Sequence, residues 1–372
     1  MIKINNNIIL FSIVLAIIFF GFFLMYSASS SFANYRFNKA DTYFLSKHFI
    51  WLLIGLLAMV FLLLTNHYLF KKYAKIILFL SWGIMLIPIL LNFGESSIDR
   101  WLKIGNFTLM TTSDFSKLAA IIFISMFIDR HYQKINDLKF LFKNLFPYLF
   151  ITIGLILYQP DLSTSIILCS IIFCLLYIAG INKKIILLLS GTSLLCLSII
   201  LSIFSYQRER LFSWIGMSEL NNQSSNSILA LANGGFTGTG IGQSIFKYNG
   251  FIPEGQTDFI LAIIGEELGF LGIFIIFLLF TILFIKGLTI SKNCSDRFSM
   301  FLSIGIIINI FFYLIINSAY VVGILPTTGL PIPFISYGGS QTIFSLISIG
   351  ILMSISKNNF NHYNRKYYYE TV

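Results

Sequence analysis

The sequence predicts an all-α fold: a polytopic integral membrane protein with ten transmembrane helices. Of the 372 residues, 57% are hydrophobic and only 11% are charged, and the mean hydropathy is +0.85. A water-soluble surface cannot be built from so few charges. The apolar residues also fall into blocks of roughly 18 to 22, the length that crosses a hydrocarbon core of about 30 Å. This composition excludes a secreted disulfide scaffold, a disordered chain and a nucleic-acid-binding domain.

The first helix is expected at 8–27, behind a short N-terminus whose one cation is Lys3. This start resembles a signal peptide, but the apolar region of a signal peptide is typically about 7 to 15 residues long. The block here is longer, so we expect the helix to be retained. The remaining blocks lie at 49–65, 76–92, 115–128, 145–158, 164–181, 185–204, 259–285, 299–322 and 341–356.

The loops between these blocks alternate in charge, as the positive-inside rule requires. Sixteen of the 25 Lys and Arg residues fall on one side with four of the 15 acidic residues, so the net charge of +10 divides into +12 there and −2 on the other side. Both termini are therefore expected to be cytoplasmic, with 358–372 as a short tail. The excess cations are expected to face anionic membrane lipids, not nucleic acid. The inner cations are Lys3, Lys71, Lys72, Lys75, Arg130, Lys134, Lys139, Lys143, Lys183, Lys184, Lys286, Lys292, Arg297, Lys357, Arg365 and Lys366.

The four cysteines indicate no disulfide and no metal cluster. Cys169, Cys174 and Cys196 fall inside predicted helices, and Cys294 falls in a cytoplasmic loop. None is placed to form a disulfide on the outer side. We interpret them as small hydrophobic core residues.

Polar chemistry collects in the outer segments, and the first of these is 96–117. It contains Arg100, Trp101, Asp114 and Lys117. Asp114 and Lys117 are three residues apart, so they share one helical face and are close enough to pair. A charge this far into a span usually faces an internal cavity. The alternative is a structural ion pair in which Lys117 reaches toward the interface, and Trp101 taken alone is more typical of an interfacial anchor.

The second outer segment is QPDLST at 159–164, which joins two apolar blocks with almost no loop. Pro160 is expected to end one helix. Asp161 either caps the next helix or places an acid in a cavity.

The third outer segment, 205–258, is the longest polar stretch and is rich in glycine. It lacks the pattern GxxxxGK[ST] and a preceding strand, so a nucleotide-binding loop is improbable. Dense glycines more plausibly let irregular backbone pack at the membrane surface. Asp258 ends the stretch directly before an apolar run. It is either a carboxylate that accepts a proton or an acid stabilised by the dipole of the following helix.

The fourth outer segment, 322–340, is uncharged and contains three prolines and repeated glycines. A continuous helix cannot form there. We expect a broken or re-entrant segment beside a substrate cavity.

Several motifs resemble the SEDS proteins of bacterial cell-wall assembly. The resemblance covers about 10–357, and its last two motifs are highly specific. The sequence at 238–247 and 329–334 is closer to the division branch of the family, FtsW, than to the elongation branch, RodA. The motifs are MYSASS at 25–30, RWL at 100–102, SDFSKLA at 113–119, QPDLST at 159–164, GGFTGTGIGQSIFKYNGFIPEGQTDFILAIIGEELGF at 234–270 and LPTTGLPIPFISYGGS at 325–340.

The resemblance implies one SEDS-type transmembrane domain over 1–372, with a large outer loop, 205–258, between helices 7 and 8. It implies a multi-pass enzyme of the bacterial cytoplasmic (inner) membrane, a peptidoglycan glycosyltransferase that polymerises lipid II on the outer face. The implied partners are a class B penicillin-binding transpeptidase and other divisome or elongasome membrane proteins. The presumed catalytic residue of the family is the aspartate of the TDF motif, here Asp258.

The sequence departs from the family pattern at three places. The usual QPSE is TTSD at 111–114, which keeps an acid in Asp114. The common QPDxGT is QPDLST, and the His that often precedes TDF is Gln256. A histidine at that position is therefore not essential to the chemistry, provided that the protein is active.

Lipid II polymerisation joins the 4-hydroxyl of an acceptor GlcNAc to the anomeric carbon of a donor MurNAc and expels a lipid pyrophosphate. Asp258 is the candidate general base. Cations are needed to stabilise the pyrophosphate. The motifs identify no certain cofactor, and a divalent cation, if one is used, is expected to be Mg²⁺-like and held by oxygen ligands together with the pyrophosphate. The candidate substrate-binding residues are Arg100, Trp101, Asp114, Lys117, Asp161, Arg208, Lys247 and Glu254, of which Glu254 and Asp161 are candidates for sugar hydroxyls or a divalent cation.

Two other classes of function stay open. A lipid II flippase or other transporter would also need broken helices and buried charges, but it would be expected to show an internal repeat of interrupted segments. The third and fourth outer segments do not resemble each other. A noncatalytic divisome scaffold would not need an acid at the mouth of an outer cavity.

Overall fold

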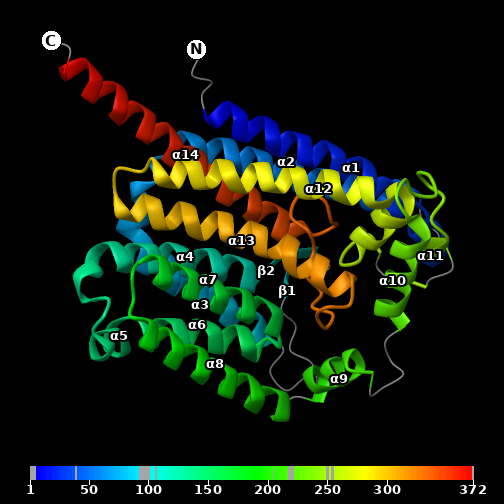
Figure 1. Cartoon of the computed structure of the whole chain (residues 1–372), viewed down its shortest axis with the longest axis horizontal. Coiled ribbons are helices and arrows are strands. Elements are labelled where there is room, and N and C mark those ends of the chain that lie inside the picture. Colours follow the sequence, from blue (N-terminus) through cyan, green and yellow to red (C-terminus); the bar gives the residue numbers. More distant parts are fainter. Residues whose placement is uncertain are drawn as a thin grey trace. The chain divides into compact units, whose positions relative to one another are not determined.

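The structure, a computed structural model, is almost entirely helical (Figure 1). It describes residues 6–37, 40–91, 101–104, 107–203, 205–216, 222–248, 251–252 and 255–370. The elements in chain order are α1 (Asn6–Phe37), α2 (Tyr43–Leu64), α3 (Tyr68–Leu91), β1 (Trp101–Ile104), β2 (Phe107–Thr111), α4 (Thr112–His131), a 3₁₀ turn η1 (Tyr132–Lys134), α5 (Leu138–Asn144), α6 (Phe146–Tyr158), α7 (Leu162–Ile178), α8 (Lys183–Ile203), α9 (Ser205–Trp214), α10 (Asn222–Gly234), α11 (Ile245–Tyr248), α12 (Ile260–Lys292), α13 (Arg297–Val321) and α14 (Gly339–Glu370).

Each apolar block expected from the sequence falls on a helix, and many of these helices can cross a membrane. Within the described ranges, six helices are long and apolar enough to do so: α1, α2, α3, α12, α13 and α14. The pair α5 and α6, bent by 52°, makes a seventh candidate if it is taken as one span. The chain is therefore a multi-pass membrane protein, and the count of ten spans stays a prediction.

The structure departs from a purely α fold between residues 101 and 111. There β1 and β2 form an antiparallel hairpin in which Trp101 lies opposite Thr111 and Ile104 opposite Phe107. Both strands consist largely of aromatic, β-branched and long apolar residues, which favour strands. The sequence predicts only an outer segment here, because strands of four and five residues give a weaker signal than the long apolar blocks of helices.

The long segment 205–258 is also more regular than expected. It contains α9, α10 and the short α11. The sequence SYQRERLFSW of α9 includes Gln, Arg, Glu and Leu, which are good helix formers, and α10 includes the run ILALA. Apart from Gly216, the glycines of this segment begin at Gly234, the last residue of α10.

The chain divides into two compact units. Unit 1 comprises Met1–Ile54, Leu197–Ile285 and Ile310–Thr342, and unit 2 comprises Gly55–Cys196, Lys286–Asn309 and Ile343–Val372. The helices α2, α8, α12, α13 and α14 each contribute residues to both units.

Helix α4 forms the centre of unit 2. Its residues from Thr112 to Ile128 are buried, apart from Phe115, which is partly exposed. It contacts α3, α6 and α7, and at Gly305 of α13 an added Cβ would lie 2.6 Å from Ile121 Cγ2. A helix that is covered on all sides needs no polar face, which explains why apolar residues occur all around α4.

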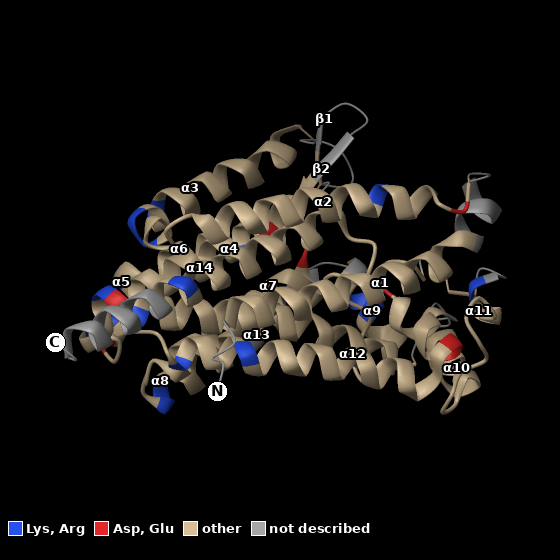
Figure 2. Cartoon of the chain, turned by 90° about the horizontal axis from the view of Figure 1, so that it is seen from above, with Lys and Arg blue, Asp and Glu red and all other residues tan. Residues whose placement is uncertain are grey.

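The helices are nearly uncharged along their lengths, and cations gather at helix ends and connections (Figure 2). In unit 2 the loops with predicted inner cations meet. Lys71 of α3 lies 2.7 Å from Asp129 of α4, and the Arg297 guanidinium lies 4.0 Å from the centroid of the Tyr132 ring. The amide of Asn182 donates to Asn136 Oδ1 at 2.7 Å. Loops predicted to share one side of the membrane therefore join one another.

His67 connects three further pieces of this region. Its Nε2 lies 2.8 Å from Ser299 Oγ of α13, and its Nδ1 lies 3.0 Å from Asn358 Nδ2 of α14. Burial lowers the pKa of His67 to about 4, so the ring is neutral at neutral pH. It therefore acts as an uncharged hydrogen-bonding link between the α2–α3 loop and these two helices.

Candidate functional site

Helix α12 is broken where the sequence reads GEELGF. Gly269 has φ 65° and ψ −160°, so the helix is interrupted after Leu268. The end of a half-helix leaves backbone carbonyls without donors from the helix itself. The amides of Thr239 and Gly240 supply them, donating to the carbonyls of Glu266 at 2.9 Å and Glu267 at 3.0 Å. The glycine-rich loop after α10 therefore completes the hydrogen bonding of a broken helix.

The glycines of this loop permit close approach of backbone to backbone. Gly238 has φ +83°, and a Cβ added there would overlap the carbonyl group of Glu267. The loop also accepts hydrogen bonds from α12 beyond the break: the Phe270 amide donates to the Gly235 carbonyl at 3.0 Å, and the Leu271 amide donates to the Phe236 carbonyl at 3.3 Å. Irregular backbone satisfied by protein contacts is what the sequence predicted, and the glycines serve packing rather than phosphate binding.

Glu266 holds three segments together through its carboxylate. It is completely buried and accepts hydrogen bonds from Asn233 Nδ2 of α10 at 2.9 Å and from the Ile245 amide of α11 at 3.0 Å. The Ser244 hydroxyl donates to its other oxygen. These donors compensate for the burial of a carboxylate.

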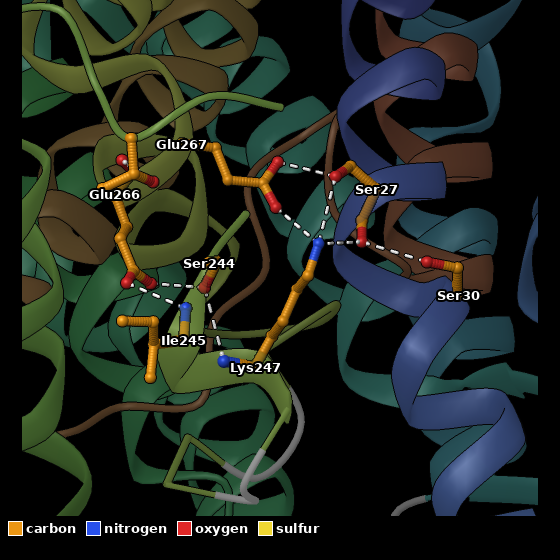
Figure 3. A network of polar contacts seen from close by, with 8 residues as sticks. Ser27, Ser30, Ser244, Ile245, Lys247, Glu266 and Glu267 are labelled. Atoms are coloured by element: carbon orange, nitrogen blue, oxygen red, sulfur yellow. Dashed lines mark hydrogen bonds and ion pairs between the residues drawn. The ribbon is translucent and has the colours of Figure 1, made fainter. Parts of the chain in front are cut away.

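Glu267, the next residue, forms further buried polar contacts (Figure 3). Lys247 Nζ of α11 lies 2.6 Å from Glu267 Oε1. Ser27 Oγ of α1 donates to Glu267 Oε2 at 2.6 Å, and Lys247 Nζ also donates to the Ser27 carbonyl at 3.2 Å. The network therefore joins α1, α11 and the first half of α12.

Lys247 is one of the candidate substrate-binding residues predicted from the sequence. Its side chain is only 3% exposed, and its charge faces Glu267 and Ser27. The structure thus places it inside unit 1 as a link between helices. The pairing was not predictable from spacing, because Lys247 and Glu267 lie 20 residues apart.

Asp258 lies in a turn directly before α12 and is half-buried. Its backbone carbonyl accepts from Asn317 Nδ2 at 2.8 Å and from the Tyr320 hydroxyl at 2.7 Å, both of α13. The same two side chains contact the Leu330 carbonyl, at 2.7 Å and 3.0 Å. These contacts fix the position of Asp258 through its backbone.

The uncharged segment after α13 lies against Asp258, and it is not helical between residues 322 and 338. Gly329 has φ +69°, and a Cβ added there would lie 3.3 Å from Asp258 Oδ2. The Tyr337 amide donates to the Gln256 carbonyl at 2.9 Å. The predicted break in the helix is confirmed, and its backbone contributes the wall beside the carboxylate.

A second polar cluster lies in unit 2, where the motifs at 111–117 and 159–164 interlock. Lys117 Nζ lies 3.2 Å from Asp114 Oδ1, as the spacing of three predicted. Asp114 Oδ2 accepts from Thr111 Oγ1 at 2.5 Å. Thr112 Oγ1 donates to Gln159 Oε1 at 2.8 Å, and Gln159 Nε2 donates to the Met85 carbonyl. The segment TTSD at 111–114, which differs from the family pattern, thus contacts the segment QPDLST directly.

Asp161 is the N-cap of α7. Its Oδ1 accepts from the Thr164 amide at 3.1 Å, which is the capping alternative drawn from the sequence. It also accepts from Ser113 Oγ of α4 at 2.8 Å and from Thr164 Oγ1 at 2.9 Å. Its carboxylate therefore connects α4 to α7. A role of Asp161 in substrate binding would come in addition to this structural role.

The remaining predicted residues are distributed as follows. Trp101 lies in β1 and is partly exposed. Arg208 lies on α9, is exposed, and donates from Nη1 to the Ser202 carbonyl at 3.4 Å. Arg100 and Glu254 lie outside the described residues.

Sequence reasoning missed Glu266, Glu267, Ser27, Asn317 and Tyr320. The two glutamates had a visible signal, because adjacent acids inside an apolar run of a membrane helix are costly unless they are paired. Asn317 likewise lies in an apolar helix. Ser27 carried no chemical signal beyond its place in a motif.

No group of three or more His, Cys, Asp and Glu side chains in the described ranges is arranged to hold a metal ion. Glu254, one of the two candidates for binding sugar hydroxyls or a divalent cation, is outside those ranges. Asp161 is engaged by Ser113 and Thr164 instead.

These features define a class: a multi-pass helical membrane protein with a broken helix, buried lysine–carboxylate pairs and an uncharged non-helical segment. Such features mark the polar sites of membrane proteins. A family model described as "Cell cycle protein", which covers FtsW, RodA and SpoVE, matches residues 7–361. The chain belongs to this family, and the predicted resemblance is confirmed.

Curated relatives align with nearly the whole chain. A "Probable peptidoglycan glycosyltransferase FtsW" of Trichlorobacter lovleyi is 32% identical and covers 94% of this chain and 93% of the relative. "Stage V sporulation protein E" of Bacillus subtilis is 31% identical and covers 95% of this chain and 98% of the relative. The FtsW name among the relatives agrees with the predicted branch.

Solved structures confirm the fold. One chain from a study entitled "Structural coordination of polymerization and crosslinking by a peptidoglycan synthase complex" has a TM-score of 0.76 and 20% identity, covering 94% of this chain and 97% of that chain. The rod shape determining protein RodA of Thermus thermophilus has a TM-score of 0.68 and 19% identity, covering 94% of this chain and 96% of that chain.

Proposed function

We propose that the chain is a peptidoglycan glycosyltransferase that polymerises lipid II into glycan strands on the outer face of the bacterial cytoplasmic membrane. Family membership over residues 7–361 and the names of its relatives support this activity. The observation that carries the proposal is the placement of Asp258. It stands before a broken helix, is held by its backbone, and has its carboxylate beside Gly329.

Asp258 is proposed as the general base. Its carboxylate takes the proton of the acceptor 4-hydroxyl while the new bond from that oxygen to the donor anomeric carbon forms. The bond from that carbon to the pyrophosphate oxygen breaks, and the lipid pyrophosphate leaves with its electron pair. Pyrophosphate is already a good leaving group, so one essential carboxylate is chemically sufficient, unlike the two of glycosidases.

The cationic contacts to pyrophosphate are proposed to come from Lys117, Arg100 and Arg208, with Trp101 and Asp114 nearby in sequence. Lys117 is buried, and its Nζ lies 3.2 Å from Asp114 Oδ1 of the same helix. An ammonium held in a low-dielectric region interacts strongly with phosphate oxygens. Lys247 is assigned to the link among α1, α11 and α12 because its charge is paired there.

The topology that goes with this function has ten spans, both termini in the cytoplasm, and 205–258 on the outer side between the seventh and eighth spans, all within one SEDS-type domain over 1–372. The alternation of charged loops supports it. A class B penicillin-binding transpeptidase is the proposed partner. The peptidoglycan synthase complex with the same fold supports that choice.

Reconstitution tests the function directly. Purified chain is placed in proteoliposomes with lipid II and a class B transpeptidase, and glycan strands and transbilayer movement of lipid II are both measured. We expect glycan strands that are absent when the chain is omitted. Movement of lipid without strands would identify a flippase, and neither product would identify a scaffold.

A further inference from the structure

The glycine-rich region of unit 1 has an exposed side that is apolar. Residues 222–246, which comprise α10, the following loop and the start of α11, contain no Asp, Glu, Lys or Arg. Large apolar side chains on this stretch are well exposed: Ile228 44%, Leu229 55%, Phe236 65%, Ile241 51% and Ile245 55%. A helix and loop in contact with water would be expected to present polar and charged residues there.

The opposite side of α10 packs against the rest of unit 1, so the apolar side is the one on the surface of the protein. Ala230 is fully buried, and Ser227 Oγ donates to the Val321 carbonyl at 2.8 Å. Gly234 lies so close to Gly265 that a Cβ would overlap its carbonyl oxygen. These residues recur at helical spacing, and Ile228 and Leu229 lie between them on the exposed face.

The exposed apolar side continues into a transmembrane helix. The Phe236 ring stacks on Phe270 with centroids 5.8 Å apart, and Phe270 stacks on Phe274 at 6.2 Å. Phe270, Phe274 and Leu278 of α12 are exposed by 54%, 51% and 46%. Since α12 is long and apolar enough to span the membrane, we expect this row of exposed side chains to face lipid.

We propose that α10 and the loop 235–245 lie in the outer interface of the bilayer, with Leu229, Phe236 and Ile241 in contact with lipid acyl chains. The occupant of the surface is lipid because the surface is uncharged and is continuous with the lipid-facing side of α12. Irregular backbone at this depth is tolerated because Glu266 and Glu267 satisfy the loop from inside.

Placing the loop in the interface also fixes the position of Asp258, the proposed catalytic base. The placement itself holds whether or not the proposed function is correct. The loop is bonded to the half-helix 260–268, and Asp258 directly precedes that half-helix. Anchoring the loop in the interface sets the depth of the half-helix. The carboxylate is thereby held near the level of phosphate and sugar groups of membrane lipids.

Site-directed spin labelling tests the proposal on the full chain. In a background that lacks the four native cysteines, nitroxides are attached to Leu229→Cys and Ile241→Cys in vesicles of phosphatidylethanolamine and phosphatidylglycerol. Leu278→Cys on α12 serves as the lipid-facing control and Glu209→Cys on α9 as the exposed charged control. Collision with oxygen, which partitions into lipid, is compared with collision with a water-soluble nickel chelate.

We expect labels at 229 and 241 to collide more with oxygen than with nickel, as at 278. Values like those at 209 would place the loop in water and overturn the proposal. Low collision with both reagents, in the absence of any partner protein, would show the face covered by a second copy and would also overturn it. Because no step requires catalysis, the result is independent of whether the chain polymerises lipid II.

Discussion

Two buried lysines in this chain each pair with a carboxylate, but the pairs are built differently. Lys117 and Asp114 lie 3.2 Å apart on one helix, α4. Lys247 and Glu267 lie 2.6 Å apart on α11 and α12 and share Ser27 of α1. The first pair lies within one helix, whereas the second joins two helices and stabilises their arrangement. We therefore expect the first to matter mainly for substrate and the second mainly for structure.

The largest effect on stability is expected from breaking the Lys247–Glu267 pair on one side. Lys247→Met leaves the buried Glu267 carboxylate without its cation, although Ser27 still donates to it. Loss of one partner of a buried pair costs about 3–5 kcal/mol. The double variant Lys247→Met with Glu267→Gln removes the uncompensated charge. Thermal unfolding in detergent should show a large loss for the single variant and substantial recovery for the double.

Equal losses for the single and double variants would contradict this assignment. They would indicate that Lys247 acts through contacts other than the pair with Glu267.

The next effect concerns the glycine loop that closes over the broken helix. Gly238 and Gly216 both have φ above +80°, but only Gly238 is crowded, by the Glu267 carbonyl. Alanine at Gly216 should cost about 1–2 kcal/mol from backbone strain alone. Gly238→Ala should lower the unfolding temperature clearly more. Equal shifts would mean that the loop does not pack against α12 as described.

A smaller effect on folding and a larger one on catalysis are expected at Lys117. Lys117→Ala should reduce kcat/KM for lipid II about 10- to 100-fold, the value of a charged hydrogen bond. Lys183 lies at the start of α8 among the predicted cytoplasmic cations, so Lys183→Ala should leave kcat/KM for lipid II unchanged. If both substitutions reduce activity equally, the effect is nonspecific destabilisation.

The smallest effect is expected at Asp161, where capping and charge can be separated. Asn is as good an N-cap as Asp, whereas Asp161→Ala should cost about 1 kcal/mol. Asp161→Asn should therefore unfold at nearly the wild-type temperature. If its polymerisation rate is also unchanged, the charge of Asp161 has no part in substrate binding.

The fold was largely predictable because its signals are local. Apolar blocks and the charge of each loop placed a helix at every expected position, and three prolines with repeated glycines predicted the break after α13. The hairpin at 101–111 was missed because its strands are short. The count of membrane spans depends on a bilayer boundary, which helix positions alone do not give.

The candidate site was predictable only where its residues are neighbours in sequence. Asp114 and Lys117 were paired correctly from a spacing of three. Lys247 and Glu267 were not, because pairing across 20 residues depends on how the glycine loop folds back on α12. Asp258 was singled out by its position and motif, but Asn317 and Tyr320, which hold its backbone, follow only from the packing of α13.

The central claim is that Asp258 is the catalytic base of a lipid II polymerase. The most direct measurement compares wild type and Asp258→Asn for glycan strand formation in the same proteoliposomes, with unfolding temperature and membrane insertion as controls. We predict that the variant inserts and unfolds like wild type but loses polymerisation, by about 10²- to 10⁴-fold as expected for a general base. Full polymerisation by Asp258→Asn would contradict the claim.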